Sequence, residues 1–293
     1  MYAIETKNLT KSYGKNRGIT DINLKVKIGE IYGFVGPNGA GKSTTIKTLL
    51  NFIYPTSGQG RILGKDIVKE SKDIKNIIGY VPSEVKLYDD ITVKELINYS
   101  KGFYKNISFD DVDYICKELE VEMDKKIGSL SLGNKKKVAL AQAMIHHPKL
   151  LILDEPTSGL DPFIQKKLFS LILKEKEKGN TVFFSSHNLV EIRELCDEVA
   201  VIKDGKIIDI INPKVYEKNL VSIVHVKGNI KEDDLKNVSK SIEKLGDNYY
   251  KFYYTGDIDK LIKYISKFTI YDITLEKEKL EDSFFKYYER EEI

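Results

Sequence analysis

GPNGAGKST, residues 36–44, matches the phosphate-binding loop pattern G-x-x-x-x-G-K-[ST]. The glycines let the backbone turn tightly, so that successive N–H groups can point at the oxygens of one polyphosphate. A helix that starts at the end of such a loop adds the positive end of its dipole. The stretch therefore predicts a site for the phosphates of a nucleotide.

Two side chains of this loop are expected to act directly on the bound group. Lys42 would reach the β- and γ-phosphates, and the Ser43 hydroxyl would bind Mg²⁺. The other residues expected to surround the phosphates are Gly36, Pro37, Asn38, Gly39, Ala40, Gly41 and Thr44.

The residues on both sides of the loop support this interpretation. Glu30–Val35 reads as a buried strand that leads into it. The apolar residues after the loop share one face of a predicted helix, and they are Ile46, Leu49, Leu50 and Ile53. Pro55 is expected to end that helix. The alternative, a glycine-rich turn that binds nothing, does not explain a complete pattern set between a strand and a helix.

Composition limits the classes of protein to which the chain can belong. Of its 293 residues, 41% are hydrophobic and 31% are charged, which is ordinary for a globular protein. The net charge of +3 is too small to predict binding to a polyanion. Two cysteines, Cys116 and Cys196, fit a reducing compartment. No signal peptide is recognisable, and no apolar run approaches the roughly 18 residues that span a bilayer, so a role at a membrane requires spans from another chain.

The first part of the chain predicts an antiparallel β edge. Ala3–Leu9 reads as a short strand, and apolar residues alternate with polar ones over Ile22–Ile28. Thr56–Gly60 reads as a loop, followed by a small strand at Arg61–Leu63. From about residue 90 to 147 the apolar period becomes helical, which predicts a helical insert. Within that insert Thr92 and Glu95 have capping-box spacing, and Ser108–Leu119 reads as a second helix.

Three further apolar runs predict the strands of a parallel sheet. They are Ile77–Val81, Leu150–Asp154 and Thr181–Ser186. An unbroken apolar run that ends in a carboxylate is typical of a central parallel strand whose carboxyl end faces an active site. Asp204-Gly205 then predicts a hairpin. The sequence as a whole predicts an α/β fold, with a P-loop NTPase core, a parallel sheet, an antiparallel β edge and a helical insert.

Over about residues 1–212 the chain resembles the nucleotide-binding subunit of an ABC transporter. The resemblance implies that ATP and Mg²⁺ are the cofactors and that Asp154 holds Mg²⁺ through water. It implies that Glu155 is the general base for the attacking water and that His187 is the switch histidine at the γ-phosphate. Ser158–Asp161 matches the turn that crosses the dimer interface of the family, which places Asp161 near the nucleotide.

Each of these residues also has a structural interpretation. Asp154 would then be a strand-end carboxylate, Glu155 a surface acid, and His187 a histidine satisfied by its neighbours. Their positions beside a phosphate loop favour the functional interpretation. Tyr13 stands where the family places an aromatic ring on the adenine, although an exposed loop aromatic is common.

The family signature, usually L-S-G-G-Q, is altered here to Leu130-Ser131-Leu132-Gly133-Asn134. Ser131 and Gly133 match the residues that clamp the γ-phosphate of the opposite subunit's ATP. Leu132 and Asn134 are expected to change the fit without abolishing it.

A second departure follows Gly79-Tyr80-Val81-Pro82. The family usually has Gln at the next position, which contacts Mg²⁺ and senses the membrane subunit. This chain has Ser83 and then Glu84. Serine is shorter than glutamine, so either Glu84 substitutes for the missing metal contact or a water bridges from Ser83.

Two short runs of like residues have plain interpretations. His146 and His147 are adjacent, so on a helix they diverge by about 100° and do not make a chelate. They are interpreted as helix-end residues. Lys135-Lys136-Lys137 is interpreted as a solvated face at the start of a helix, with a faint indication of a role opposite phosphates.

Residues 213–293 form a different region, for which a small accessory α+β module is predicted. Val221–Val226, Tyr249–Tyr254 and Phe268–Thr274 read as strands, and Asp233–Leu245 has helical spacing. The closing Leu280–Phe285 begins a predicted final helix and resembles the end of ATPase subunits of ABC-2 type exporters. A stabilising extension and a regulatory module are both left open.

Three classes of function are consistent with these residues. The first is an ATPase that powers transport, with export favoured by the tail, through a separate transmembrane permease. The second is a soluble ABC ATPase acting on ribosomes or nucleic acid, and the third is a nucleotide-gated subunit without catalysis. The first is preferred, with a second ATPase subunit as partner, homodimeric or heterodimeric, and no nucleic acid. It implies a cytoplasmic protein held at the inner face of the membrane by its partner.

Overall fold

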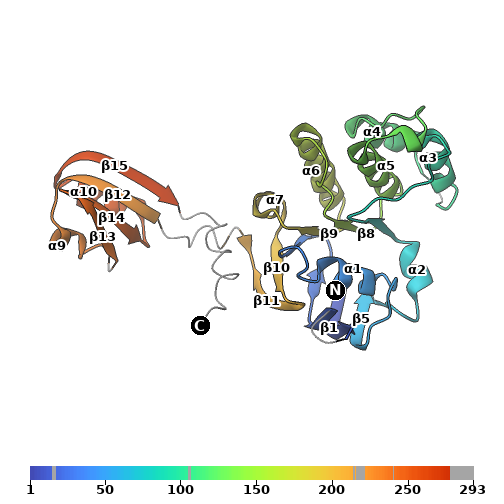
Figure 1. Ribbon diagram of the computed structural model, residues 1–293, viewed down its shortest axis with the longest axis horizontal. Coiled ribbons are helices and arrows are strands. Elements are labelled where there is room, and N and C mark those ends of the chain that lie inside the picture. Colours follow the sequence, from blue (N-terminus) through green and yellow to red (C-terminus); the bar gives the residue numbers. More distant parts are fainter. Residues whose placement is uncertain (15–17, 105–106, 214, 216–221, 240, 278–293) are drawn as a thin grey trace. The chain divides into compact units, whose positions relative to one another are not determined.

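The structure is a computed structural model that describes residues 1–14, 18–104, 107–213, 215, 222–239 and 241–277. The chain divides into two compact units, Met1–Pro213 and Lys214–Ile293 (Figure 1). The first unit contains two sheets and the second contains one, and each unit has its own buried apolar cluster.

A six-stranded sheet forms the centre of the first unit, in the order β11-β10-β4-β9-β8-β7. Its strands are β4 (Ile31–Val35), β7 (Ile78–Val81), β8 (Leu150–Asp154), β9 (Thr181–Ser186), β10 (Glu198–Lys203) and β11 (Lys206–Ile211). Neighbouring strands pair in parallel from β10 to β7, and β11 runs antiparallel to β10. The predicted parallel α/β core is confirmed, as is the hairpin at Asp204-Gly205, where both residues have positive φ.

Burial explains why these strands are apolar throughout. Every residue of β4, β8 and β9 is buried, since both faces of the sheet are covered. Because the strands are parallel, the loops that follow β4, β7, β8 and β9 meet at one edge of the sheet. These four loops carry most of the residues that the sequence singles out.

A second, antiparallel sheet has the order β2-β1-β5-β6, and β3 also pairs with β1. Its strands are β1 (Tyr2–Ser12), β2 (Gly18–Ile22), β3 (Lys25–Lys27), β5 (Ser57–Ile62) and β6 (Lys65–Asp66). The antiparallel edge is confirmed, but the prediction of a loop at Thr56–Gly60 was wrong. Most of that stretch belongs to β5, because β1 pairs with it from Ser57 to Ile62. The alternating segment Ile22–Ile28 is interrupted between β2 and β3.

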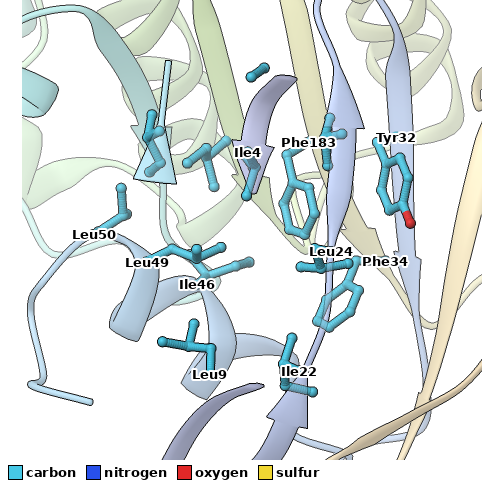
Figure 2. Close-up of a cluster of buried hydrophobic side chains, with 14 of the residues drawn as sticks. Ile4, Leu9, Ile22, Leu24, Tyr32, Phe34, Ile46, Leu49, Leu50 and Phe183 are labelled. Atoms are coloured by element: carbon cyan, nitrogen blue, oxygen red, sulfur yellow. The ribbon is translucent and has the colours of Figure 1, made fainter. Parts of the chain in front are cut away.

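The main apolar cluster of the first unit lies between the two sheets and α1 (Lys42–Leu49). Figure 2 shows side chains from β1, β4, β9 and α1 gathered in it. The ring of Phe183 stacks on Tyr32 at 6.0 Å between centroids and lies 5.4 Å from Phe34. Ile46 and Leu49 are fully buried there, which confirms this part of the predicted helix face. The prediction was wrong for Ile53, because α1 ends at Leu49. The helix ends before Pro55, at a turn in which Asn51 has a φ of +53°.

The helical insert contains α3 (Val93–Lys101), α4 (Phe109–Glu118), a 3₁₀ turn (Ile127–Ser129) and α5 (Leu132–Met144). The capping box that begins α3 is confirmed: the Thr92 hydroxyl accepts from Glu95 N, and the Glu95 carboxylate accepts from Thr92 N. The second predicted helix is confirmed as α4, which Ser108 caps. The remaining helices of this unit are α2 (Ser71–Lys75), α6 (Pro162–Glu177) and α7 (Leu189–Leu195). Cys116 and Cys196 are both buried.

The second unit is a four-stranded antiparallel sheet of order β13-β14-β12-β15 with two helices. Its elements are β12 (Ser222–Asn229), α9 (Glu232–Leu235), β13 (Ile242–Gly246), β14 (Tyr249–Tyr254), α10 (Ile258–Ile265) and β15 (Thr269–Lys277). The helix predicted over Asp233–Leu245 was wrong, because that stretch gives one short turn and then β13. Helix α10 was not predicted, and the closing Leu280–Phe285 segment lies outside the described residues.

Within the described ranges, no helix is both long enough and apolar enough to cross a membrane.

Candidate active site

A cavity of about 1060 Å³ opens at the carboxyl edge of the parallel sheet. Most of its wall comes from the glycine-rich loop, the Tyr13 region, the β10–β11 turn and the loops that follow β7 and β8. The lining residues are Lys11, Ser12, Tyr13, Gly14, Gly18, Thr20, Pro37, Asn38, Gly39, Gly41, Lys42, Ser43, Thr44, Ser83, Glu155, Asp204, Gly205 and Lys206. A cavity of this size, lined by backbone N–H groups and lysines, suits a nucleotide.

The glycine-rich loop needs its glycines for two different reasons. Gly39 and Gly41 have φ values of +83° and +108°, which side-chain-bearing residues rarely adopt. Gly36 instead lies against the sheet, where a Cβ would come within 2.3 Å of the Ile202 carbonyl oxygen. Gly36 and Ala40 are therefore not in the cavity wall, but they shape the loop that forms it.

Lys42 begins α1 and is only 6% exposed. Its Nζ donates to the carbonyl oxygens of Gly36 at 2.6 Å and Pro37 at 3.2 Å. It also lies 3.1 Å from Glu155 Oε1, which forms no hydrogen bond of its own. The loop lysine is thus paired with a carboxylate from the end of β8.

Asp154 ends β8 and is completely buried. The Ser185 hydroxyl donates to its Oδ1 at 2.6 Å, whereas its Oδ2 has no hydrogen-bond partner among the described residues. A buried carboxylate oxygen without a partner is costly unless a cation or water satisfies it. Ser43 lines the cavity, whereas Asp154 is not among the residues of its wall. This donor set, a hydroxyl and a free carboxylate oxygen, fits Mg²⁺, which prefers oxygen ligands and retains waters.

Glu155 has a φ of +49°, in the left-handed region that few residues other than glycine adopt. Its N–H donates to Ser185 O and Ser185 Oγ, both at 3.2 Å. Its Oε2 lies 2.7 Å from Nδ1 of His187, which follows β9 and has a side chain that is 58% exposed. The structure therefore brings Lys42, Glu155 and His187 together in one chain of polar contacts.

Ser83 and Glu84 are the two candidates for the metal contact after Pro82. The structure places Ser83 in the cavity wall and leaves Glu84 outside it. The backbone here is held by Lys136, whose Nζ donates to Pro82 O at 3.0 Å and to Ser83 O at 2.8 Å. It lies 3.3 Å from Glu155 O as well.

The interpretation of Lys135-Lys136-Lys137 as a solvated face was wrong for its central residue. Lys136 is 4% exposed, and burial lowers the pKa of its ammonium group, with Asp154 and Glu155 opposing that effect. Helix α5 turns this side chain inward, under the loops of the site, while Lys135 pairs with Asp89 at 2.8 Å nearer the surface.

The histidine pair lies just beyond α5 and makes structural contacts. His146 Nε2 is 3.1 Å from Ile78 O, and its ring stacks on Tyr104. His147 lies between Glu175 and Asp111, at 3.0 and 3.2 Å. No cluster of His, Cys, Asp or Glu able to hold a metal occurs in the described part of the chain.

The comparisons with known proteins agree with this geometry. The family model described as "ABC transporter" matches residues 19–158, and a second, for an AAA domain, matches residues 125–193. The bacitracin transport ATP-binding protein BcrA of Bacillus licheniformis is 44% identical over 210 residues, which are 70% of this chain and 68% of that protein. The chain belongs to the ABC transporter ATP-binding family. It is accordingly an ABC ATPase, in which ATP hydrolysis is coupled to transport.

Other relatives and solved structures extend this similarity. The linearmycin resistance ATP-binding protein LnrL of Bacillus subtilis is 34% identical over 214 residues, 71% of this chain and 68% of that protein. The multidrug protein YbhF of Escherichia coli is 38% identical, and the match covers 36% of its length. A dimeric ATP-binding cassette, MJ0796 with ADP and Pi, superimposes with a TM-score of 0.65 at 26% identity, covering 72% of this chain and 98% of that one.

The altered signature of this ABC ATPase begins α5. Ser131 caps the helix by accepting from Asn134 N at 3.3 Å, and Leu132 is 82% exposed. A Cβ on Gly133 would come within 2.5 Å of the Gly159 carbonyl oxygen, so the signature packs against the turn after β8. Among the described residues, neither Ser131 nor Gly133 lines the cavity of its own chain.

Two other predicted nucleotide residues of the ABC ATPase have different positions. Tyr13 lines the cavity and is 53% exposed, with Lys11 Nζ 5.2 Å from its ring centre. Asp161 lies outside the cavity wall, where its Oδ1 caps α6 by accepting from Phe163 N and Ile164 N. The N–H of Ile164 is the main reason that the pKa of Asp161 is lowered.

Sequence reasoning missed the walls of the cavity that lie far from the motif in the chain. They include Thr20 from β2 and Asp204 and Lys206 from the β10–β11 turn. Strand β10 pairs with β4, and Gly205 N donates to Ala40 O at 2.9 Å, which brings this turn to the loop. A hairpin signal marks the turn, but nothing local in the sequence indicates its partner.

Proposed function

We propose that this chain is the ATP-hydrolysing subunit of an export system for antibiotic-like compounds, acting through a separate transmembrane partner. The relatives that support export are named for bacitracin transport, multidrug transport and linearmycin resistance. The observation that carries the catalytic part is the position of Glu155, between Lys42 and His187 at the mouth of the cavity.

Different residues of the cavity are proposed to bind the phosphates, to hold Mg²⁺ and to activate the attacking water. The backbone N–H groups of the glycine-rich loop and Lys42 bind the phosphates, which replace Gly36 and Glu155 as partners of the lysine. Ser43 and, through water, Asp154 would hold Mg²⁺, which neutralises charge on the phosphates. Glu155, once released from Lys42, orients the attacking water and accepts its proton.

His187 lies where it can serve both Glu155 and the γ-phosphate. Its Nδ1 contacts the Glu155 carboxylate, while its other ring nitrogen is available to the nucleotide. We propose that His187 contacts both Glu155 and the γ-phosphate, so that its position changes when the γ-phosphate is lost. Tyr13 is proposed to stack on the adenine ring.

A second subunit completes the site. Ser131 and Gly133 stand at the exposed N-terminus of the 13-residue helix α5, away from their own chain's cavity. That helix end offers N–H groups and a positive dipole to a phosphate of another chain. We propose that two ATPs are sandwiched between two subunits, in a homodimer or a heterodimer, as the dimeric MJ0796 cassettes permit. Asp161 is then a residue of the dimer interface.

The loop that carries Ser83 provides a place for the transmembrane partner. A cavity of about 250 Å³ lies beside it, between β7, α5 and Tyr104. Its wall mixes apolar and aromatic groups with Lys86 and His146, as expected for a surface that receives part of another protein. Docking there would hold the subunit at the inner face of the membrane. Residues 213–293 are proposed to be an accessory module of the same complex.

The first experiment is a mild-detergent pull-down of the tagged chain from host membranes, with mass spectrometry of the proteins that co-purify. A multi-span protein in stoichiometric amount is the expected result. Ribosomal or DNA-associated proteins without a membrane partner would refute the export proposal and favour a soluble ABC ATPase. ATP hydrolysis by the purified chain tests the catalytic part separately.

A further inference from the structure

Lys136 is a buried cation at a junction of three segments of the site. It belongs to α5, whose first turn carries the altered signature. Its Nζ reaches carbonyl oxygens of Pro82 and Ser83 after β7 and of Glu155 after β8, at 3.0, 2.8 and 3.3 Å. The three N–H donors of an ammonium group match these three acceptors in number.

Burial makes this position costly for a lysine. An ammonium group removed from water loses several kcal/mol of solvation, which only good hydrogen bonds and nearby negative charge can offset. The carboxylates of Asp154 and Glu155 supply that charge. An unbranched apolar side chain such as methionine would occupy the same space without this cost, so the cation does more than fill volume.

Lys136 contacts the backbone of Glu155, which has an unfavourable conformation. Glu155 is held at a φ of +49°, which a residue with a side chain adopts only when its surroundings fix it. Ser185 holds its N–H from β9, and its carbonyl oxygen accepts from Lys136 of α5 and from the N–H of Ser158, both at 3.3 Å. The direction of the Glu155 carboxylate depends on this peptide geometry.

We propose that Lys136 is a positioning residue, which locks the Ser83 loop to the Glu155 turn and so sets the Glu155 carboxylate for hydrolysis. The inference rests on the proposed role of Glu155 as the base. Lys136 is not among the residues that line the cavity, so its loss should affect the rate of hydrolysis and leave nucleotide affinity intact.

The test measures ATP hydrolysis and nucleotide affinity of the full-length chain in Lys136→Met, with Lys137→Met as the matched control. Both changes remove one charge from the same helix at equal side-chain length, but Lys137 is the more exposed. Lys136→Met should lower kcat by about tenfold or more, the effect of losing a charged hydrogen bond, with nucleotide Kd unchanged. Lys137→Met should keep the kcat of the unaltered chain.

The same pair of changes is then made in a Glu155→Gln background and followed by single-turnover hydrolysis. Because Lys136 acts through Glu155, Lys136→Met should cause less than about a twofold further loss there. An equal loss in both backgrounds, or equal kcat for the two lysine variants, overturns the inference. Near-normal turnover by Glu155→Gln would instead overturn the proposed base, and this inference with it.

Thermal unfolding followed by circular dichroism shows whether Lys136→Met is folded. If it is not, Lys136→Gln replaces it, because an amide still donates two N–H bonds. That variant should have a kcat between those of the unaltered chain and the Glu155→Gln chain. A Lys136→Gln chain with unaltered kcat overturns the inference.

Discussion

The contact between Lys42 and Glu155 means that the Glu155 carboxylate and the nucleotide phosphates compete for the Lys42 ammonium group. Glu155 Oε1 lies 3.1 Å from the lysine, and arriving phosphates must take its place. Nucleotide binding therefore has to break an ion pair that is almost fully buried on the lysine side. Glutamate at this position is expected to weaken ATP binding as well as to promote hydrolysis.

Glu155→Gln is accordingly predicted to have two opposite effects. Hydrolysis should fall by about 10²-fold or more, because the amide cannot accept a proton from water. ATP should bind more tightly than to the unaltered chain, because the amide competes less for Lys42. Equilibrium binding of a fluorescent ATP analogue and phosphate release measure the two effects. Weaker binding by the variant would contradict this account of the pair.

At the scale of the elements, the insert is joined to the core through His147. This residue follows α5, and its ring lies between Asp111 of α4 and Glu175 of α6. Its hydrogen bond with Glu175 is the main reason that its pKa is raised, against the opposing effect of burial. The imidazole of His147 thus ties one helix of the insert to one helix of the core.

This contact predicts a dependence of stability on pH. The pKa of His147 is higher in the folded than in the unfolded chain, so its contribution is complete below about pH 6.5 and is lost as pH rises through the folded value. His147→Asn removes the titration, and asparagine tolerates the φ of +47° at this position. The Tm difference between the unaltered chain and the variant should be larger at pH 6 than at pH 8. A difference that does not change with pH would exclude His147 as the source.

The start of α3 makes a second prediction at this scale. Thr92 and Glu95 exchange hydrogen bonds across the first turn, so Thr92→Ala should cost about 1 kcal/mol of stability, mainly within the insert. Hydrogen exchange of the α3 amides is the suitable measurement, with the exposed Lys94→Ala as control. Equal exchange in the two variants would mean that tertiary packing alone fixes this helix end.

Local sequence patterns predicted the elements whose signals are local. The glycine-rich loop, the buried strands β8 and β9 and the cap at Thr92 all depend on neighbours in the chain. The first part of strand β5 was missed because Ser57-Gly58-Gln59-Gly60 has little strand propensity, and its pairing with β1 is what makes it extended. The segment Asp233–Leu245 shows the reverse case, in which apparent helical spacing yields to pairing between β13 and β14.

The same distinction applies within the site. The motif residues Lys42, Asp154 and Glu155 were predictable because each stands at the end of a recognisable strand or loop. The inward direction of Lys136 depends on how α5 lies under two loops that are distant in sequence. The cavity walls at Thr20 and Lys206 likewise depend on which strands pair. Side-chain environment, in contrast to residue type, is set by tertiary structure.

At the scale of the whole molecule, the position of the signature outside its own cavity separates the two halves of the proposed composite site. Each chain presents a phosphate loop in one place and Ser131 with Gly133 in another. If two chains complete each other's sites, two differently inactivated chains should restore activity when mixed.

The mixing experiment uses Lys42→Ala, which disables the phosphate loop, and Ser131→Arg, which blocks the signature. Each should be inactive alone. A random mixture should recover about a quarter of the normal rate, since half of the dimers are mixed and each has one intact site. ATP hydrolysis over a range of mixing ratios checks this. A mixture with only the summed residual rates would show that each site is built within one chain.

The burial of both cysteines has a practical consequence for labelling. Burial raises the pKa of the Cys116 thiol to about 11 and raises that of Cys196 further, so both stay protonated and shielded at neutral pH. A thiol introduced at Leu132, which is 82% exposed beside the signature, would therefore react first with a maleimide dye. The native sequence already serves as a background for attaching one fluorophore, and energy transfer between two labelled copies can follow each cycle of closure and release in real time.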